Sequence, residues 1–486
     1  MDAGGAAGNQ TTGAAPAGAQ GAGRVKASWW QVGLGAGAGL YGAMMVMAFA
    51  TLNHPELAIA LPIVAVIGLI FAMNPFFAVC CLLFFAQLDG VQDKIFAPSP
   101  VGGFKLMAAG ATFGVIVTAF QNRGMVKDGL SQPIAVMGLL FGVSMGVSAL
   151  GADAKYMAMN SMRRLFSMII FMYLLIFLVT TRERFEKALM ILAATSLISG
   201  VILILDVKLG LTLVSTSDAA TTARTAEGFE RSSGGSQYNP TTAATMMLTG
   251  VIIALVMLVE QETHKRFYLA AAGIGTLALV FSFARSSFLV YSITALFLFY
   301  RYRHHRLIIP AMVIGSLIGV VMLPFVPASY FDRIASIFGG GGGDWTLGRR
   351  MTYNVIGVDL LTKHPLFGVG PGNFKAHFVD SGYRYLPGRT MYGRQLHNMH
   401  LSIMVEYGLI GATFFYGMVF SAFRGAFRAM RAPVDARIGV LATAYFYALL
   451  AYMLVSVFVP NEYNKYTWIM LGLGAALPRI NKKDVA

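Results

Sequence analysis

Apolar residues along this chain occur in long runs that are separated by shorter polar, often basic, segments. A helix needs roughly 17–25 mostly apolar residues to cross a bilayer. Runs of this kind lie near residues 33–51, 57–73, 75–90, 104–120, 133–150, 165–180, 187–205, 240–259, 267–284, 286–300, 307–325, 399–423, 438–459 and 463–478. The pattern predicts about fourteen transmembrane helices. The closely spaced pairs around Asn74 and around Arg285 could each be one broken or re-entrant helix, which would leave about twelve.

The distribution of basic residues supports this assignment of transmembrane helices. Cytoplasmic loops of membrane proteins are enriched in Lys and Arg. With the N-terminus placed in the cytoplasm, the predicted cytoplasmic segments contain Arg123, Lys127, Arg182, Arg184, Lys187, Lys265, Arg266, Arg301, Arg303, Arg306, Arg424, Arg428, Arg431, Arg437, Arg479, Lys482 and Lys483. The alternation of cytoplasmic and outer segments holds to the end of the chain, so we expect the C-terminus to be cytoplasmic too.

The predicted membrane topology divides the chain into five regions. We expect a disordered cytoplasmic tail at 1–32, transmembrane helices at 33–325 with an outer loop at 206–239, a large outer loop at 326–398, transmembrane helices at 399–478 and a cytoplasmic tail at 479–486. The large loop is too long for a simple connection, so we expect it to be functional.

Composition agrees with an all-α, multi-span membrane protein. Hydrophobic residues make up 56% of the chain and charged residues 12%, about half the charged fraction of an average soluble protein. The net charge of +15 fits the basic cytoplasmic segments. We find no basic face interleaved with aromatic residues and therefore expect no nucleic-acid partner. Cys80 and Cys81 are adjacent and lack metal-ligand spacing, so we interpret them as packing residues.

The two predicted outer segments are unusually rich in arginine. This runs against the topological bias and favours a polyanionic ligand, because guanidinium groups pair with phosphate through charge-assisted hydrogen bonds. Lipid headgroups or internal salt bridges are the alternative. The candidates are Arg224, Arg231, Arg333, Arg349, Arg350, Arg384, Arg389 and Arg394.

Arg285 lies within an apolar run, where an arginine costs on the order of 2.5–3.5 kcal/mol on insertion scales. It could bind phosphate together with Ser286, or extend to the membrane surface from a helix end. Arg231 precedes a Ser-Ser-Gly-Gly-Ser stretch and Asn239-Pro240. That segment could form an anion site at a helix N-terminus or an ordinary polar loop.

Two further motifs follow in the large loop and the next apolar run. The glycines around Gly370 do not have the spacing of a dinucleotide fingerprint and favour a tight turn. His397 and Asn398 lie where the loop meets the apolar run. A neutral imidazole there can accept a proton from an attacking hydroxyl group, and a structural hydrogen-bonding role is the alternative. His400 would share a helical face with His397, but a third metal ligand at good spacing is missing, so we expect neither a metal nor another cofactor.

These residues resemble a known family. Arg-Arg-Met-Thr-Tyr-Asn at 349–354, Lys-His-Pro-Leu-Phe-Gly-Val-Gly-Pro-Gly-Asn-Phe at 363–374 and His-Asn-Met-His-Leu-Ser-Ile-Met-Val-Glu-Tyr-Gly-Leu-Ile-Gly at 397–411 are similar to the signature of the O-antigen ligase/polymerase superfamily. This superfamily includes O-antigen ligases, Wzy-type polymerases and bacterial O-oligosaccharyltransferases. The segments around Arg231 and Arg285 resemble upstream parts of the same pattern, although alanine replaces the serine or threonine often found before the second arginine.

The resemblance implies a GT-C-like membrane fold with a long helical periplasmic loop. It also implies a glycosyltransferase of the bacterial inner membrane that takes its glycan from undecaprenyl diphosphate, without a metal ion, at the periplasmic face. The arginines would neutralise the diphosphate, His397 would accept the proton of the acceptor hydroxyl, and the anomeric centre would invert. Lipid A–core, a growing polysaccharide or a protein could be the acceptor. A polysaccharide or lipid transporter is the alternative from another class, although we find no internal repeat of the kind many transporters have.

Overall fold

The structure is a computed structural model. It describes residues 65–95, 103–211, 232–237, 239–260, 263–306, 345–386 and 392–483, together with scattered positions between 35 and 46. The side chains of residues 345–349 lie outside this description. Residues Met1–Ala65 and Val66–Ala486 form two separate units. The second unit contains helices and, within the described ranges, no strand, which confirms the all-α prediction.

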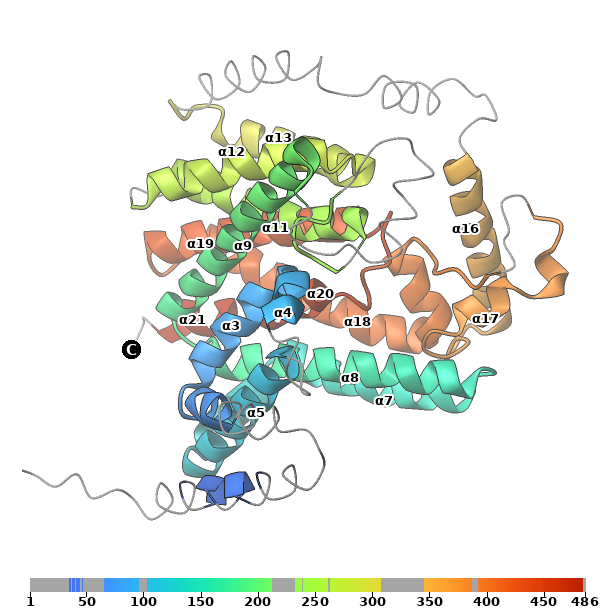
Figure 1. Cartoon of the computed structure of the whole chain (residues 1–486), viewed down its shortest axis with the longest axis horizontal. Coiled ribbons are helices and arrows are strands. Elements are labelled where there is room, and N and C mark those ends of the chain that lie inside the picture. Colours follow the sequence, from blue (N-terminus) through green and yellow to red (C-terminus); the bar gives the residue numbers. More distant parts are fainter. Residues whose placement is uncertain are drawn as a thin grey trace, which may run out of the picture. The chain divides into compact units, whose positions relative to one another are not determined.

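The helices of this unit are labelled in Figure 1. They are α3 (Pro75–Gln87), α4 (Asp89–Ile95), α5 (Gly103–Gln121), α6 (Arg123–Leu130), α7 (Pro133–Leu150), α8 (Lys155–Leu178), α9 (Arg182–Leu209), α11 (Pro240–Glu260), α12 (Lys265–Phe281), α13 (Arg285–Tyr302), α16 (Trp345–Lys363), α17 (Phe374–Phe378), η2 (Ser381–Tyr383), α18 (Met399–Arg431), α19 (Ala436–Val455), α20 (Lys465–Gly474) and α21 (Leu477–Lys483).

Seven of the described helices are long and apolar enough to cross a membrane, which confirms a multi-span membrane protein. They are α5, α7, α8, α9, α11, α18 and α19. The expected total of twelve to fourteen cannot be counted here, because the predicted spans at 33–51, 57–73 and 307–325 lie wholly or partly outside the described residues.

The two doubtful helix pairs have different structures. The helix Ala65–Met73 and α3 are bent by 112° at Asn74, as a broken span or a re-entrant loop would be. Around Arg285 the chain forms two helices, α12 and α13, separated by a turn in which Phe283 has a φ of 51°.

Local sequence signals account for several helix ends. Thr181, Asp435 and Asn464 precede α9, α19 and α20, and each side chain accepts a hydrogen bond from a backbone N–H of the first turn. Such caps satisfy donors that have no partner within the helix. Pro75 and Pro133 occupy the first positions of α3 and α7, where the missing N–H costs nothing.

Helix α11 lies at the centre of this packing, and nearly all of its side chains are buried. It contacts α9, α12 and α19 (Figure 1). A side chain at Gly250 would clash with the Leu192 carbonyl oxygen and the Ser196 side chain of α9. Small residues of this kind let membrane helices approach closely, and this close approach holds the centre of the unit together.

The predicted long outer segment is helical where it is described, in α16, α17 and η2. It has its own apolar cluster, formed by Tyr353, Ile356, Leu360, Val369, Phe374, Phe378, Leu396, Leu401 and Val405. Because Leu401 and Val405 belong to α18, this cluster fixes the segment to the beginning of that helix.

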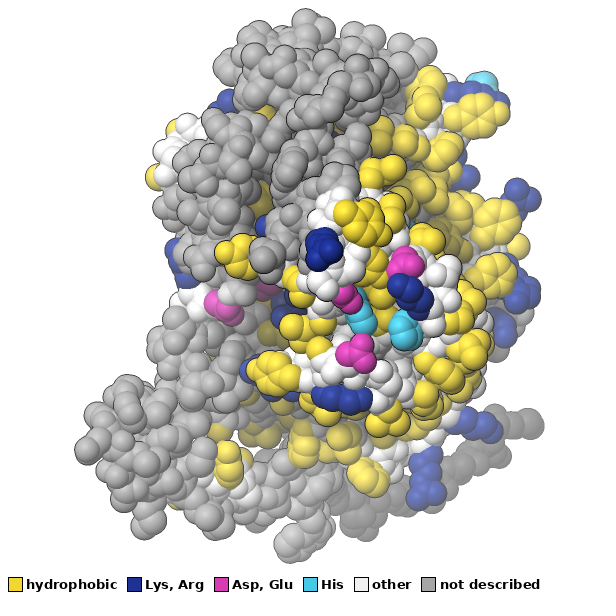
Figure 2. All heavy atoms as spheres, turned by 90° about the vertical axis from the view of Figure 1, so that its right-hand side faces the viewer, with side chains coloured by type: hydrophobic (Ala, Val, Ile, Leu, Met, Phe, Trp, Pro, Cys, Tyr) yellow, Lys and Arg dark blue, Asp and Glu magenta, His cyan; other side chains and the backbone are white. Residues whose placement is uncertain are grey.

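Charged and histidine side chains gather on the face where α16 and α17 lie (Figure 2). His377 of α17 faces Asp153, between α7 and α8, with 3.5 Å between Nε2 and the carboxylate. Burial lowers the pKa of His377, and Asp153 opposes that shift. The contact ties the outer segment to the α7–α8 turn as well as to α18.

Candidate functional site

Helix α18 is interrupted at Gly408, where φ is 66° and ψ is −175°. The segment 365–372 lies against this interruption and supplies the hydrogen bonds that the helix loses there. The bonds run from Leu409 N to Pro365 O (2.8 Å), Ile410 N to Leu366 O (3.2 Å), Val369 N to Val405 O (2.9 Å) and Gly370 N to Glu406 O (3.0 Å). The loop and the helix therefore form one structural unit.

Glycine is required on both sides of this contact. A side chain at Gly408 would clash with the Leu366 backbone, and its positive φ is strained for any other residue. Gly370 has a φ of 99°, and a side chain there would clash with Ala152. The turn expected around Gly370 is therefore present, and it allows the loop to reach the interrupted helix.

The interruption positions the carboxylate of Glu406. This side chain is buried, and its Oε2 accepts hydrogen bonds from Gly372 N (2.8 Å) and the Tyr463 hydroxyl (2.6 Å). The Tyr463 hydroxyl also lies 3.1 Å from the hydroxyl of Tyr407. The network thus joins the glycine-rich loop, α18 and the α19–α20 connection.

A second buried carboxyl group, Glu462, comes from the α19–α20 connection. Its Oε1 accepts a hydrogen bond of 2.8 Å from Ser402 Oγ, whereas its Oε2 has no hydrogen-bond partner among the described residues. Burial, followed by repulsion from Glu406, raises the pKa of Glu462 to about 8. A carboxyl group in this environment keeps its proton near neutral pH, so it can donate as well as accept a hydrogen bond.

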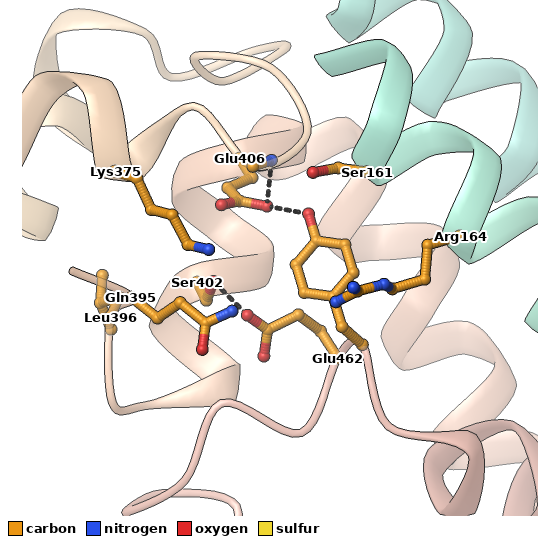
Figure 3. Close-up of a pocket in the computed structure, with 10 residues that line it drawn as sticks. Ser161, Arg164, Lys375, Gln395, Leu396, Ser402, Glu406 and Glu462 are labelled. Carbon is orange, nitrogen blue, oxygen red and sulfur yellow. Dashed lines mark hydrogen bonds between the residues drawn. The ribbon is translucent and has the colours of Figure 1, made fainter. Parts of the chain in front are cut away.

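The two carboxyl groups line a small pocket with a volume of about 40 Å³. Figure 3 shows side chains converging on it from α8, α17, α18 and the α19–α20 connection. Its lining consists of Ser161, Arg164, Gly372, Lys375, Gln395, Leu396, Ser402, Glu406, Glu462 and Tyr463. We call this space the inner pocket.

The inner pocket adjoins a wider, more open groove of about 750 Å³. The two share Ser161, Arg164, Gly372 and Lys375, so the pocket is the closed end of the groove. Lys105 and Arg163 also line the groove. We call Lys105, Arg163, Arg164 and Lys375 the cationic groove. Four positive side chains around one space suit an anionic ligand, because guanidinium and ammonium groups form strong bonds with phosphate.

The three predicted residues at the start of α18 differ in their surroundings. His397 is half-buried and stacks on Tyr353, with 5.5 Å between the ring centres. It follows Leu396, which lines the inner pocket, but does not line the pocket itself. Asn398 caps α18 by accepting hydrogen bonds from the backbone N–H groups of His400 and Leu401.

His400 does not line the inner pocket. Its Nδ1 lies 2.8 Å from the Tyr416 hydroxyl and its Nε2 3.0 Å from the Met453 carbonyl oxygen. Both ring nitrogens thus have partners within the helix packing, which is the arrangement of a structural histidine. Among the described residues, no group of three or more His, Cys, Asp or Glu side chains is arranged to hold a metal ion.

The predicted arginines are not brought together at the inner pocket. Arg285 is the half-buried first residue of α13, and neighbouring Ser286 is buried with its Oγ unpartnered among the described residues. Arg350 is half-buried on α16 and Arg394 is exposed; neither lines the pocket or the groove. Arg231 and the side chain of Arg349 lie outside the described residues. Their proposed phosphate roles remain predictions.

The polar loop after Arg231 has partners within the protein. Ser236 Oγ and Gln237 N donate to Asp89 at 3.0 and 2.8 Å, and Ser232 Oγ donates to Asp206 at 2.7 Å. These carboxylates take up donors that an anion would need. Within the described part of this loop, the structure therefore favours the ordinary polar loop.

Sequence reasoning assigned no role to Arg163, Arg164, Lys375 or Glu462, which line the groove and the pocket. Arg163 and Arg164 lie between the predicted spans at 133–150 and 165–180, on the predicted outer side. This adjacent basic pair therefore runs against the topological bias in the same way as the arginines of the two long outer segments, and it was a usable signal. Glu462 lies between two apolar runs, and its sequence surroundings do not indicate that it meets Ser402.

A model of a known protein family matches part of the chain. Residues 269–416 match the family model described as O-Antigen ligase, a range that runs from α12 into α18 and includes the glycine-rich loop and its contact with Gly408. No curated protein matches the chain.

Proposed function

The chain is a member of the O-antigen ligase/Wzy superfamily by its domain at residues 269–416, and from this premise we propose that it transfers a glycan from undecaprenyl diphosphate to lipid A–core. Members of this superfamily are glycan ligases and polymerases. We further propose that the protein lies in the bacterial inner membrane, with both termini in the cytoplasm and its active site in the periplasm.

The cationic groove carries this proposal. A polyprenyl diphosphate is an anion at the membrane surface, and its charge grows on the leaving oxygen as the sugar departs. Preorganised cations near that oxygen stabilise the transition state more than the ground state. Arg163 and Arg164 extend from α8, and Lys375 from α17, into the same space. The groove therefore offers the positive charge that this donor requires.

The transfer forms one bond as it breaks another. The oxygen of an acceptor hydroxyl bonds to the anomeric carbon, and the bond from that carbon to the diphosphate oxygen breaks, with the electron pair leaving on the diphosphate. The hydroxyl proton passes to His397, which is next in the chain to the pocket-lining residue Leu396. An ionised diphosphate leaves without receiving a proton, so a single base is sufficient. Attack opposite the leaving group inverts the anomeric centre.

Two acceptors other than lipid A–core fit the same chemistry. A growing polysaccharide would make the protein a Wzy-type polymerase, and a hydroxyl group on a protein would make it an O-oligosaccharyltransferase. All three versions use the same donor, the same groove and the same base, so one assay with different acceptors separates them.

A reconstituted assay tests the proposal directly. Wild-type protein in liposomes, given an undecaprenyl-diphosphate-linked glycan and lipid A–core, should form a new glycosidic bond. Arg164→Ala should raise the donor KM about tenfold or more, since a hydrogen bond between charged groups contributes roughly 1.5–3 kcal/mol. The matched control is Arg123→Ala, an exposed residue of α6. Movement of the glycan across the membrane without bond formation would instead identify a transporter.

The base has a separate test. His397→Ala should abolish transfer while the protein remains folded in the membrane, because the attacking hydroxyl loses its proton acceptor. His305→Ala replaces a half-buried histidine distant in sequence and provides the control. Full activity of His397→Ala would remove the base assignment and leave the donor site unaffected.

A further inference from the structure

A second open groove lies between α13 and α19, which are both labelled in Figure 1. Its volume is about 530 Å³, and small-molecule sites in proteins have roughly 300–1,000 Å³. Its lining includes Phe297, Tyr300, Arg301, Arg303, Phe446 and Leu450. We call this space the α13–α19 groove. Among the described residues, it shares no lining residue with the cationic groove or the inner pocket, so the proposed glycan transfer gives it no role.

The α13–α19 groove has a charged end and an apolar end. Arg301 lies in the last turn of α13, and Arg303 follows that helix directly. Phe297 lies about one helical turn before Arg301, and Leu450 about two turns beyond Thr443, which Arg301 contacts. The predicted topology places the end of α13 and the beginning of α19 at the same face of the membrane. The groove therefore runs from two arginines at that face towards apolar side chains deeper in the bilayer.

Both guanidinium groups are held in place by uncharged partners. Arg301 Nη2 donates to Thr443 Oγ1 at 3.4 Å. Arg303 Nη1 donates to the Tyr300 carbonyl oxygen at 3.2 Å, and its guanidinium carbon lies 4.4 Å from the centre of the Tyr300 ring. These bonds leave the positive charges in place, and each guanidinium group has five N–H donors, so donors remain for a ligand. Among the described residues, no Asp or Glu lines the groove, so its charged end suits an anion.

The surroundings of the α13–α19 groove select a lipid as the ligand. One wall belongs to α19, which is apolar and long enough to cross the membrane. On the other wall, Phe297 is 48% exposed and Tyr300 is 67% exposed. Exposed apolar side chains on membrane helices contact lipid, and tyrosine is enriched where the bilayer meets water. A free phosphate ion would fill the charged end alone, whereas a phospholipid offers a phosphate group and an acyl chain together.

We propose that the α13–α19 groove binds an anionic phospholipid of the membrane. Its phosphate group lies between Arg301 and Arg303, and one acyl chain follows Phe297, Phe446 and Leu450. Basic pockets between membrane helices favour anionic headgroups, because the net charge of the lipid then adds to the phosphate contacts. The site is independent of the proposed glycan transfer, since it requires only that the protein crosses a membrane.

Native mass spectrometry of the full-length protein in detergent tests the charged end. Wild-type protein should bind dioleoylphosphatidylglycerol more tightly than dioleoylphosphatidylcholine. The double variant Arg301→Ala, Arg303→Ala should raise the Kd for dioleoylphosphatidylglycerol at least about tenfold, because each arginine near a lipid phosphate contributes to binding. The matched control is Arg123→Ala with Lys127→Ala, which removes the same charge from exposed positions of α6 and should bind as the wild type does.

A third variant tests the apolar end. Leu450→Trp fills that part of the groove without changing the charge, so it should also weaken the binding of dioleoylphosphatidylglycerol. Thermal unfolding provides a second measurement, since a ligand that binds only the folded protein raises its unfolding temperature. The lipid should stabilise the wild type and the α6 control but neither groove variant. If the alanine variant does not fold, Arg301→Gln with Arg303→Gln removes the charge and keeps polar side chains.

Four outcomes would overturn the inference. Equal affinity for the two lipids in the wild type would exclude selection by charge, and equal losses in the groove and α6 variants would show a general attraction to positive proteins. Normal lipid binding by Leu450→Trp, or displacement of the lipid by inorganic phosphate, would reduce the site to a simple anion site. A wild-type dimer that Leu450→Trp converts to a monomer, with lipid binding unchanged, would assign the groove to a second copy of the chain.

Discussion

Gly372 donates its backbone N–H to the buried carboxylate of Glu406 across 2.8 Å, and this bond joins the glycine-rich loop to the interruption in α18. The two residues are 34 positions apart in the chain. Both residues line the inner pocket. Changes to the loop or to the interruption should therefore alter the pocket as well as the stability of the fold.

Gly408→Ala should destabilise the protein. The new side chain would clash with the Leu366 backbone, and the positive φ of 66° adds strain. A non-glycine residue in this region of backbone conformation costs about 1–3 kcal/mol, and the clash adds to that. Thermal unfolding in detergent measures the effect. Gly142→Ala, on α7 with no atom near the new methyl group, is the control and should stabilise by about 0.5–1 kcal/mol. Equal unfolding temperatures for both variants would contradict the strain at Gly408.

Stability should depend on pH through Glu462. The pKa of its carboxyl group rises on folding from 4.5 to about 8, because burial and Glu406 disfavour the charged form. Between these values the unfolded chain has released the proton and the folded protein keeps it. Raising the pH through this window therefore weakens the fold. Thermal unfolding of Glu462→Gln should lose this part of the pH dependence. A variant with the same pH profile as the wild type would disprove the shift.

Tyr353→Leu should slow transfer without weakening donor binding. Tyr353 stacks on His397 at an interplanar angle of 25° and holds the imidazole in place. Aromatic pairs contribute about 0.5–1.5 kcal/mol, so kcat should fall about 2- to 12-fold while the donor KM stays constant. Single-turnover kinetics separate the two effects. Tyr385→Leu, at a tyrosine that is 76% exposed, serves as the comparison. Loss of donor affinity instead of rate would assign Tyr353 to the donor site.

Asp89→Ala should loosen the loop 232–237. Asp89 is buried and accepts hydrogen bonds from Ser236, Gln237 N and Lys465. Its removal leaves these donors unsatisfied, at a cost of roughly 1–3 kcal/mol for a buried group. Limited proteolysis should show faster cleavage near this loop. Asp128→Ala, an exposed residue of α6, provides the reference rate. Equal cleavage in both variants would show that Asp89 does not hold the loop.

Hydrophobic patterning was sufficient for the fold class and for much of the helix placement. A span is a local property of some twenty residues, so α7, α9 and α19 could be predicted from their own sequences. The turn around Gly370 could be predicted for the same reason, because glycine spacing is local.

The candidate site was less accessible to such reasoning, because it is built from distant parts of the chain. Glu462 lies 60 positions from Ser402, and only the packing of α18 against the α19–α20 connection brings them together. His400 appeared equivalent to His397 in the sequence, but its partners Tyr416 and Met453 come from the helix packing. Helical periodicity indicates which residues lie on the same face of one helix. It does not identify the residues of other helices that this face contacts.

The interruption of α18 also has a consequence for biogenesis. A ribosome makes the segment 365–372 before it makes α18, yet Val369 and Gly370 find their backbone acceptors only on that helix. Unpaired backbone groups cannot remain in a membrane interior. The backbone groups of the glycine-rich loop must therefore stay hydrated until α18 has been inserted. Only then can they form their hydrogen bonds to that helix. The candidate site should thus be completed late in assembly, so that partly synthesised chains lack it.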